Sequence, residues 1–445
     1  MLTVAIVFAA MASSGQLAHA RTGRAKWNVY HATAAGSGVL KGSIALSHVR
    51  QVWQSPALSG QLYGEPLVSG SYVYVATTAD VVYALNAADG TIAWSKTVGT
   101  PVPATSLPCG DISPTVGIVG TPVIDPARHE IFAVADEQVS GSPSHHLVGL
   151  DTATGAVLLD QLVDPPGSTP SAQLQRTGLN LTAGSVVFGM GGNSGDCSTY
   201  HGWVIGVPES GGEAHRFEAD RSASEGAVWM GGAAPVVDRS KDVWVATGNG
   251  SNTSGEPQDG DSVLKLSPSM ERLDSFTPSN WAQDNAADAD LGSTVPALLS
   301  HGHVVQVGKS QTAYVLKRKA LGGVGGELSK LTGMGGTTFD GGSAIEKSTV
   351  YLPCRKGPMS ATVDKSGELH INWAASVSSA GPPIVAGGLV WVMDQSGHVD
   401  SLNPATGAIT QQVSVGSVAN HFPTPSAGDG LLFAPATNSV FAFGE

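Results

Sequence analysis

The chain has 445 residues, of which 41% are hydrophobic and only 13% are charged, and it contains 57 glycines and 26 prolines. Disordered chains combine low hydrophobicity with high charge density, so this composition excludes that class. The formal net charge of −13, without a basic stripe, argues against nucleic acid and anionic membrane surfaces as partners. Abundant Gly and Pro beside a large apolar fraction favour many short strands joined by turns.

The first twenty residues predict an export signal. An apolar run from Leu2 to Ala12 precedes Ala18-His19-Ala20, an A-x-A cleavage pattern, although no Lys or Arg precedes the run. A membrane anchor is the alternative, but the run is shorter than the roughly 20 residues that span a bilayer. We therefore expect a signal peptide at 1–20, a secreted or periplasmic mature chain without a membrane span, a lead-in at 21–47 and a single domain at 48–445.

The chain has three cysteines, Cys109, Cys197 and Cys354. Outside the cytoplasm, one disulfide and one remaining thiol are expected from this number. The sequence leaves all three pairings open.

The clearest repeat unit runs from Pro66 to Val98. It contains four short runs of mainly β-branched and aromatic residues, which turn residues separate, at 66–68, 72–76, 82–86 and 92–94. Four strands in about 40 residues form one blade of a β-propeller. The first unit therefore predicts a propeller fold.

The same pattern recurs in copies at 121–151, 186–206, 234–266, 295–298, 350–352 and 390–403. An eighth copy begins near Pro425 and holds only three strands. We expect residues 49–53 to supply its fourth strand, because Trp53 matches Trp94 and because joining the first and last strands removes an exposed sheet edge. The sequence thus predicts an all-β, eight-bladed propeller of four-stranded blades with few helices; seven blades are the alternative, since the fifth and sixth copies are weakest.

Several short motifs lie on this predicted propeller. In chain order they are Pro108-Cys109-Gly110-Asp111, then 191–197 followed by His201-Gly202-Trp203-Val204, then Trp229 with Thr247-Gly248-Asn249, then Thr277-Pro278 with Ala287-Asp288-Ala289-Asp290, and finally Lys309. Together with the repeats, these motifs resemble the pyrroloquinoline quinone (PQQ) dehydrogenases over nearly the whole chain. In that family PQQ lies over a tryptophan in the central funnel, beside Ca²⁺ and a catalytic aspartate.

The resemblance implies a cofactor and metal site. Trp229 would stack on PQQ, since a flat indole suits a planar quinone. Asn249 and Asp196 would ligate Ca²⁺, which prefers oxygen donors; Asp196 is displaced by about one residue from the family's acidic ligand. The alternatives are an ordinary buried Trp, a capping Asn and a polar turn residue.

The resemblance also implies a catalytic pair. Asp288, a further Ca²⁺ ligand, takes the position of the catalytic base, and Asp290 lies next to it, a pair of carboxylates of which one could have its pKa raised toward that of a useful base. Lys309 falls where the family places a cation beside the quinone oxygens, which would stabilise a developing anion. The alternative for Lys309 is a solvated loop residue, and Ala287 replaces the Trp that the family has before its base.

Cys109 is the remaining predicted cofactor contact. The family has a Cys-Cys-Asp run whose vicinal disulfide covers the cofactor, and Gly110 replaces the second cysteine here, so that disulfide cannot form. No haem is expected, because the chain has no Cys-x-x-Cys-His motif.

Two functions follow from these motifs. The first is a PQQ- and Ca²⁺-dependent dehydrogenase for an alcohol or sugar, in which Asp288 removes the hydroxyl proton while hydride passes to the quinone C5. The second is a non-catalytic propeller that binds a protein or the cell envelope, which the imperfect motifs and the missing cysteine favour.

Overall fold

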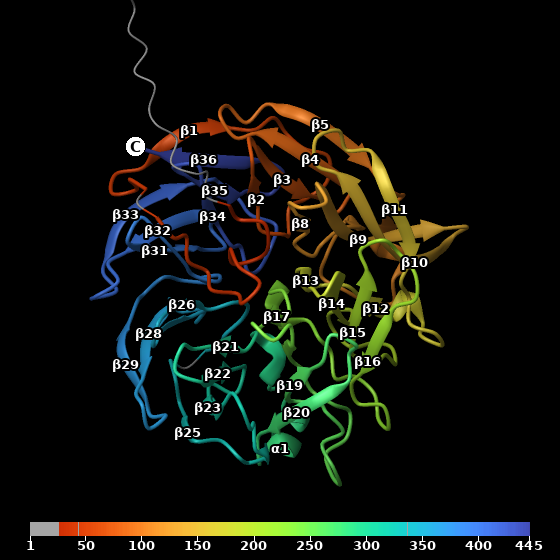
Figure 1. Cartoon of the computed structure of the whole chain (residues 1–445), viewed down its shortest axis with the longest axis vertical. Helices are drawn as coiled ribbons and strands as arrows, with labels where there is room; N and C mark the ends of the chain where they lie inside the picture. Colours follow the sequence, from red (N-terminus) through yellow and green to blue (C-terminus); the bar gives the residue numbers. More distant parts are fainter. Residues whose placement is uncertain (1–25, 43, 336) are drawn as a thin grey trace, which may run out of the picture.

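The computed structural model describes residues 26–42, 44–335 and 337–445. The predicted signal peptide lies outside the described residues. Eight antiparallel sheets stand around a central axis and form an eight-bladed β-propeller (Figure 1). The predicted fold class is therefore confirmed, and eight blades rather than seven are present.

The first four blades follow the repeat copies in order. Blade 1 is β2 (Leu67–Ser69), β3 (Tyr72–Ala76), β4 (Val81–Asn86) and β5 (Ile92–Thr97), and blade 2 is β8 (Val123–Asp125), β9 (Glu130–Val139), β10 (Ser142–Asp151) and β11 (Val157–Leu162). Blade 3 is β12 (Gln173–Leu174), β13 (Asn180–Thr182), β14 (Ser185–Gly192), β15 (Trp203–Pro208) and β16 (His215–Glu218). Blade 4 is β17 (Val236–Val237), β18 (Val243–Ala246), β19 (Val263–Leu266) and β20 (Arg272–Thr277), with β24 (Gly323–Val324) parallel to β20.

The other four blades complete the ring. Blade 5 is β21 (Ala297–Leu298), β22 (His303–Val307), β23 (Ala313–Lys317) and β25 (Ser329–Leu331), and blade 6 is β26 (Ala344–Glu346), β27 (Thr349–Leu352), β28 (Met359–Val363) and β29 (Leu369–Ala374). Blade 7 is β30 (Ile384–Ala386), β31 (Leu389–Met393), β32 (His398–Leu402) and β33 (Ile409–Ser414), and blade 8 is β34 (Ser426–Gly428), β35 (Leu431–Pro435), β36 (Val440–Gly444) and β1 (Arg50–Gln54).

Little regular structure lies outside the blades. Strands β6 (Val102–Pro103) and β7 (Thr115–Val116) form a small ribbon between blades 1 and 2. Among the described residues the helices are α1 (Trp281–Ala286) and the 3₁₀ turns η1 (Ala104–Ser106), η2 (Pro170–Ala172), η3 (Met230–Gly232) and η4 (Leu291–Ser293). None of the helices in this part of the chain is long and apolar enough to cross a membrane.

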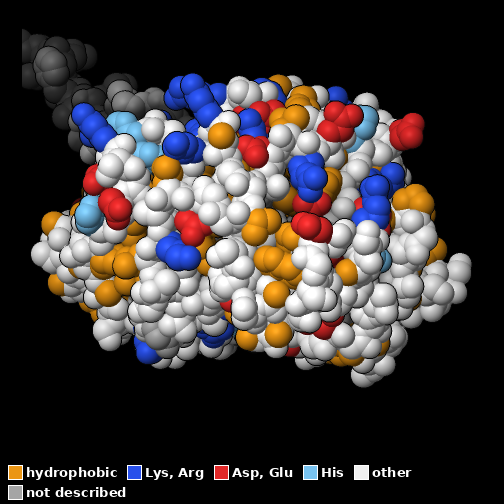
Figure 2. Space-filling view, turned by 90° about the horizontal axis from the view of Figure 1, so that it is seen from below, with side chains coloured by type: hydrophobic (Ala, Val, Ile, Leu, Met, Phe, Trp, Pro, Cys, Tyr) orange, Lys and Arg blue, Asp and Glu red, His pale blue; other side chains and the backbone are white. Residues whose placement is uncertain are grey.

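Burial within a blade explains the sequence pattern. In blade 1 the middle strand β4 is buried at every residue except Asn86, whereas the outermost strand β5 is exposed at nearly every residue. Middle strands pack against a neighbouring blade on both faces and therefore need continuous apolar runs, while outer strands meet water. Seen from the side, the molecule is a flattened disc on whose rim charges of both signs are interspersed (Figure 2).

Strand β1 closes the ring as predicted. It pairs antiparallel with β36, so the first and last strands of the propeller share blade 8. Trp53 of β1 donates its indole N–H to the carbonyl of Ala87 at 3.0 Å and packs on Gly90 in the turn of blade 1. Equivalent contacts join blade 1 to blade 2 and blade 6 to blade 7, through Trp94 on Gly155 with Thr152, and Trp373 on Gly407 with Pro404.

The lead-in segment is part of the core. Its Trp27 and His31 are fully buried, and its backbone hydrogen-bonds to the innermost strands of five different blades, at Val68, Ile124, Val237, Ile345 and Val385. Glu65 is buried beneath it and accepts hydrogen bonds from the Trp27 indole at 3.0 Å and the His31 backbone N–H at 2.8 Å. The segment thus lies across the channel and ties the inner strands together.

Candidate functional site

Loops at one end of the ring line a cavity of about 520 Å³. Ligand cavities in proteins are roughly 300–1,000 Å³, so this one has the volume of a small-molecule site. Five predicted site residues line it together, although they come from the loops after β14, β16, β18, α1 and β22: Asp196, Trp229, Asn249, Asp288 and Lys309.

Trp229 gives the cavity a flat apolar surface. Its half-buried ring lies just before η3 and packs with Ala172, Tyr200 and Ala227. The ammonium of Lys309 lies 5.6 Å from the ring centroid, a cation–π distance. Trp229 therefore lines the cavity, and its stacking on PQQ stays a prediction.

The Thr247-Gly248-Asn249 turn packs closely against the carboxylate of Asp290. The backbone N–H of Asn249 donates to Asp290 Oδ1 at 2.8 Å. A Cβ at Gly248 would stand 2.3 Å from the same oxygen, so only glycine leaves room for this carboxylate. The side-chain oxygen of Asn249 is buried and has no hydrogen-bond partner among the described residues, which leaves an acceptor free at the cavity.

Asp288 is held through one of its two oxygens. Its Oδ1 accepts hydrogen bonds from the Asn249 amide at 3.0 Å and from Lys309 Nζ at 2.9 Å. Lys309 also contacts Asp290 Oδ2 at 2.5 Å. Burial alone would lower the pKa of Lys309, but the carboxylates of Asp290 and Asp288 raise it above its usual value, so the lysine stays cationic. Lys309 is therefore part of an ion-pair network and not a freely solvated residue.

Acidic groups gather on this side of the cavity. Asp196, in a turn after β14, accepts a hydrogen bond from the Tyr200 hydroxyl at 2.7 Å, and Glu225 lines the same wall. Burial, followed by the charges of Asp290 and Asp288, raises the pKa of Asp196, and burial and its acidic neighbours raise that of Glu225. Four carboxylates against Lys309 make this wall attractive to a cation.

Arg176 faces the cavity and was missed by sequence reasoning. Its guanidinium is buried, donates to the side-chain oxygen of Asn420 at 2.7 Å and lies 5.6 Å from the centroid of the Tyr63 ring. No carboxylate forms a salt bridge with it within the described residues. A buried guanidinium without a carboxylate favours an anionic group of a ligand. No recognised motif surrounds Arg176, so the sequence carried no signal for it.

Phe422 is a second residue that the sequence did not indicate. It lies in the loop between β33 and β34, and its ring centroid is 6.0 Å from that of Trp229. The guanidinium of Arg176 lies 5.9 Å from the Phe422 centroid. The loop of blade 7 therefore brings an aromatic side chain against the surface predicted to hold a quinone.

The structure pairs Cys109 with Cys197 in a disulfide and leaves Cys354 as a buried thiol. Cys109 does not line the cavity but a small neighbouring hollow that shares Asp111 and Asn193 with it. The disulfide ties the loop of Cys109 to the loop that carries Asp196. The Cys109 role as a cofactor contact stays a prediction.

A family model described as outer membrane protein assembly factor BamB, PQQ_2, matches residues 18–280, more than half of the chain. The chain belongs to the PQQ_2 family. None of the curated proteins matches it. The acidic residues Asp196 and Glu225 lie within the matched range, whereas Asp288 and Lys309 follow it in the sequence.

Solved structures share the propeller of this PQQ_2 member. The quinohemoprotein alcohol dehydrogenase from Comamonas testosteroni has a TM-score of 0.70 at 15% identity, covering 94% of this chain and 81% of that one. A europium-containing methanol dehydrogenase has a TM-score of 0.69 at 13% identity, covering 95% and 98%. BamB from Moraxella catarrhalis has a TM-score of 0.59 at 14% identity, covering 89% and 98%. At these identities the likeness establishes the fold alone.

The donors at the cavity fit a hard cation. The free Asn249 side-chain oxygen and the Asp288 and Asp196 carboxylates offer only oxygen atoms, the ligands that Ca²⁺ prefers. The indole of Trp229 and the buried guanidinium of Arg176 fit a planar ligand with carboxylate groups. The residues present are therefore compatible with PQQ and Ca²⁺.

Proposed function

We propose that this propeller is an exported PQQ- and Ca²⁺-dependent dehydrogenase that oxidises an alcohol or a sugar. One observation supports this most strongly: Trp229, the unpartnered oxygen of Asn249, Asp288 and Lys309 line a single cavity of about 520 Å³ although separate loops carry them. A planar surface, a free metal donor, a base and a cation are the parts that the reaction requires.

Asp288 is suited to remove the substrate's hydroxyl proton. Its Oδ1 is anchored by Asn249 and Lys309, its side chain is 74% exposed, and no hydrogen bond engages Oδ2 among the described residues. Oδ2 accepts the proton and, because the side chain is open to solvent, releases it there after turnover. PQQ, when bound, supplies the acceptor for the hydride.

Lys309 and Arg176 place two positive charges beside the proposed ligand. Lys309 stays cationic and balances Asp288 and Asp290, so it can also stabilise negative charge that develops at the reacting oxygens. Arg176, whose guanidinium is held by Asn420 in the same cavity, offers a fixed positive charge to a carboxylate of the cofactor. The two cations thus give the ligand one orientation.

The proposal is tested by reconstitution. The mature chain is mixed with PQQ and Ca²⁺, passed over a desalting column, and assayed for dye reduction with a panel of alcohols and sugars. We expect quinone absorbance to stay with the protein and dye reduction to depend on substrate. Asp288→Asn should keep the quinone and lose dye reduction by at least about a hundredfold, since a positioned base contributes roughly 10²–10⁴.

Asp89→Asn is the matched control, because Asp89 is an exposed turn carboxylate of blade 1 that hydrogen-bonds Thr91 far from the cavity lining. It should match the wild type in both readouts. Quinone absorbance that leaves the wild-type protein at micromolar concentration would contradict the proposal.

A second function is supported by Phe422. Its ring lies beside Trp229 and occupies part of the space in which a quinone would stack. The ion pairs from Lys309 to Asp288 and Asp290 already neutralise part of the charge at the cavity. The family description also names an assembly factor. A non-catalytic propeller that binds a protein or envelope partner would retain no quinone, and Phe422→Ala would not restore binding.

Export is proposed from residues 1–20 and is supported by the Cys109–Cys197 disulfide, since structural disulfides persist outside the cytoplasm. The mass of the protein recovered from a cell-envelope or culture fraction tests it. A mass that retains residues 1–20 would contradict cleavage.

A further inference from the structure

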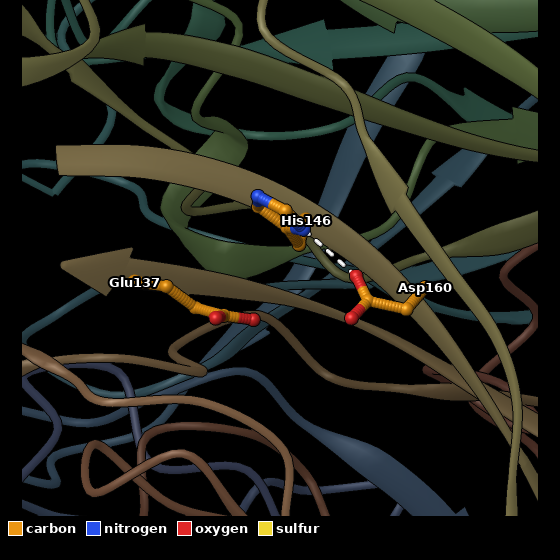
Figure 3. A group of neighbouring side chains, drawn as sticks. All are labelled: Glu137, His146 and Asp160. Carbon is orange, nitrogen blue, oxygen red and sulfur yellow. Dashed lines mark hydrogen bonds and ion pairs between the residues drawn. The ribbon is translucent and has the colours of Figure 1, made fainter. Parts of the chain in front are cut away.

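Blade 2 carries a group of metal-ligand side chains that do not line the cavity. Glu137 lies near the end of β9, His146 on β10 and Asp160 on β11 (Figure 3). Glu137 pairs with Ser144 and Asp160 with Val148, so the alternation of strands places all three side chains on one face of the blade. None of the three lines the cavity described above.

The three side chains converge on one point. One ligand atom from each, a carboxylate oxygen or an imidazole nitrogen, lies within 4.8 Å of the other two. His146 Nδ1 is 2.7 Å from Asp160 Oδ1. In Figure 3 the second Asp160 oxygen and the Glu137 carboxylate face each other below the imidazole. Two carboxylates and one imidazole at these distances offer oxygen and nitrogen atoms of the kinds that ligate metal ions.

The carboxylate of Glu137 is buried although one of its oxygens has no hydrogen-bond donor among the described residues. Its side chain is packed against Gly99, where a Cβ would come within 2.2 Å of its carboxyl carbon, and the residue is only 8% exposed. Its Oε1 is buried and has no hydrogen-bond partner within the described residues. A buried carboxylate without a donor costs free energy, which a bound cation would offset.

The exposure of the three side chains and the chemistry of their ligand atoms limit which metal ion can bind. The Asp160 side chain is 53% exposed and that of His146 20% exposed, so an ion reaches the group from the rim of the propeller and water completes its coordination. An imidazole nitrogen suits Zn²⁺, Cu²⁺ or Ni²⁺, whereas Ca²⁺ and Mg²⁺ prefer oxygen alone.

We propose that Glu137, His146 and Asp160 form a second metal site, which binds a divalent transition-metal ion of the Zn²⁺ class on the outer part of blade 2. Glu137 and Asp160 supply oxygen ligands and His146 a nitrogen ligand, with the His146–Asp160 hydrogen bond giving way to the ion. The site is independent of the proposed PQQ cavity.

Zn²⁺, added without a quinone, is the probe. Mature protein, freed of metal by a chelator, is titrated with Zn²⁺ by calorimetry in the presence of millimolar Ca²⁺. We expect one equivalent to bind, to raise the melting temperature, and to be lost at micromolar Zn²⁺ in His146→Ala. Glu137→Gln keeps the shape of the side chain and removes its buried charge, so it should fold and yet lose the same equivalent.

His398→Ala is the matched control. His398 Nδ1 lies 2.9 Å from Asp394 Oδ2, a His–Asp pair on blade 7 in which only the histidine is exposed and which lacks a third convergent ligand among the described residues. It should keep the equivalent, and so should Asp288→Asn in the cavity. Zn²⁺ binding that is absent from the wild type, or unchanged in both His146→Ala and Glu137→Gln, would overturn the proposal, and neither result depends on quinone binding.

Discussion

At the scale of single residues, the substitution of Arg176 is expected to weaken PQQ binding. If its buried guanidinium holds a carboxylate of the cofactor, Arg176→Gln removes a charge-assisted hydrogen bond that contributes about 1.5–3 kcal/mol. We expect PQQ affinity to fall by roughly 10–150-fold in a fluorescence titration, because each 1.4 kcal/mol is tenfold. Arg221→Gln, whose side chain is 77% exposed and pairs with Glu218, is the control. Equal affinity in wild type and Arg176→Gln would show that the guanidinium holds no ligand.

Glu65 gives a pH dependence with a defined sign. Burial raises the pKa of Glu65 well above its ordinary value, against smaller lowering effects of its bonds from Trp27 and His31. The folded state therefore holds this proton more tightly than the unfolded chain. The stability that results is fully present below the unfolded pKa of about 4.3 and is lost as pH rises through the folded pKa.

We expect wild type to lose free energy of unfolding relative to Glu65→Gln between pH 5 and pH 8, because the glutamine keeps an acceptor for Trp27 and His31 without a titrating proton. Urea unfolding of both proteins at the two pH values measures this. A constant difference between them would contradict the buried, protonated carboxyl.

At the scale of elements, the tryptophans on outer strands join neighbouring blades. Trp53 is the one that closes the ring, because β1 belongs to blade 8 and its indole packs on the Gly90 turn of blade 1. Trp53→Ala should lower the free energy of unfolding by about 3–5 kcal/mol, the usual cost of truncating a buried large aromatic residue. Chemical denaturation measures it.

Gly90→Ala tests the same contact from the other side. A Cβ there would stand 2.4 Å from the Trp53 ring, in a backbone conformation with φ +73°. Gly70→Ala is the control, since Gly70 has φ +62° but open space around its Cβ. The control should lose only the backbone cost of roughly 1 kcal/mol, and Gly90→Ala distinctly more. Equal losses would mean that Trp53 does not depend on this turn.

For the whole molecule, the Cys109–Cys197 disulfide closes a loop with a sequence separation of 88. The chain-entropy model gives about 4–5 kcal/mol for such a loop. The double variant Cys109→Ser with Cys197→Ser should lose stability of this order and should no longer respond to a reducing agent. Wild type whose melting temperature is unchanged by reduction would contradict a structural role.

Much of this architecture could be predicted from the sequence. Apolar runs bounded by turns predicted the blades, and the match of Trp53 to Trp94 predicted which strand closes the ring. The lead-in was expected only to precede the domain, whereas Trp27 and His31 are buried among inner strands. Such long-range packing leaves no local periodicity, so it could not be predicted from the sequence.

The candidate site was predictable only where a motif carried it. The family resemblance indicates five residues that the fold places at one cavity: Asp196, Trp229, Asn249, Asp288 and Lys309. Arg176 and Phe422 enter from loops without a motif, and the disulfide partner of Cys109 depends on which loops meet in space. These features follow from the closed ring and not from any local segment.

The proposed function requires that one cavity bind a planar quinone together with a hard cation. Equilibrium dialysis of the mature chain against PQQ, with Ca²⁺ and with a chelator, measures it most directly. We expect one PQQ per chain with Ca²⁺, weaker binding with the chelator, and none in Trp229→Ala. Dialysis that leaves PQQ equally distributed across the membrane, with Ca²⁺ present and the protein folded, would contradict the claim.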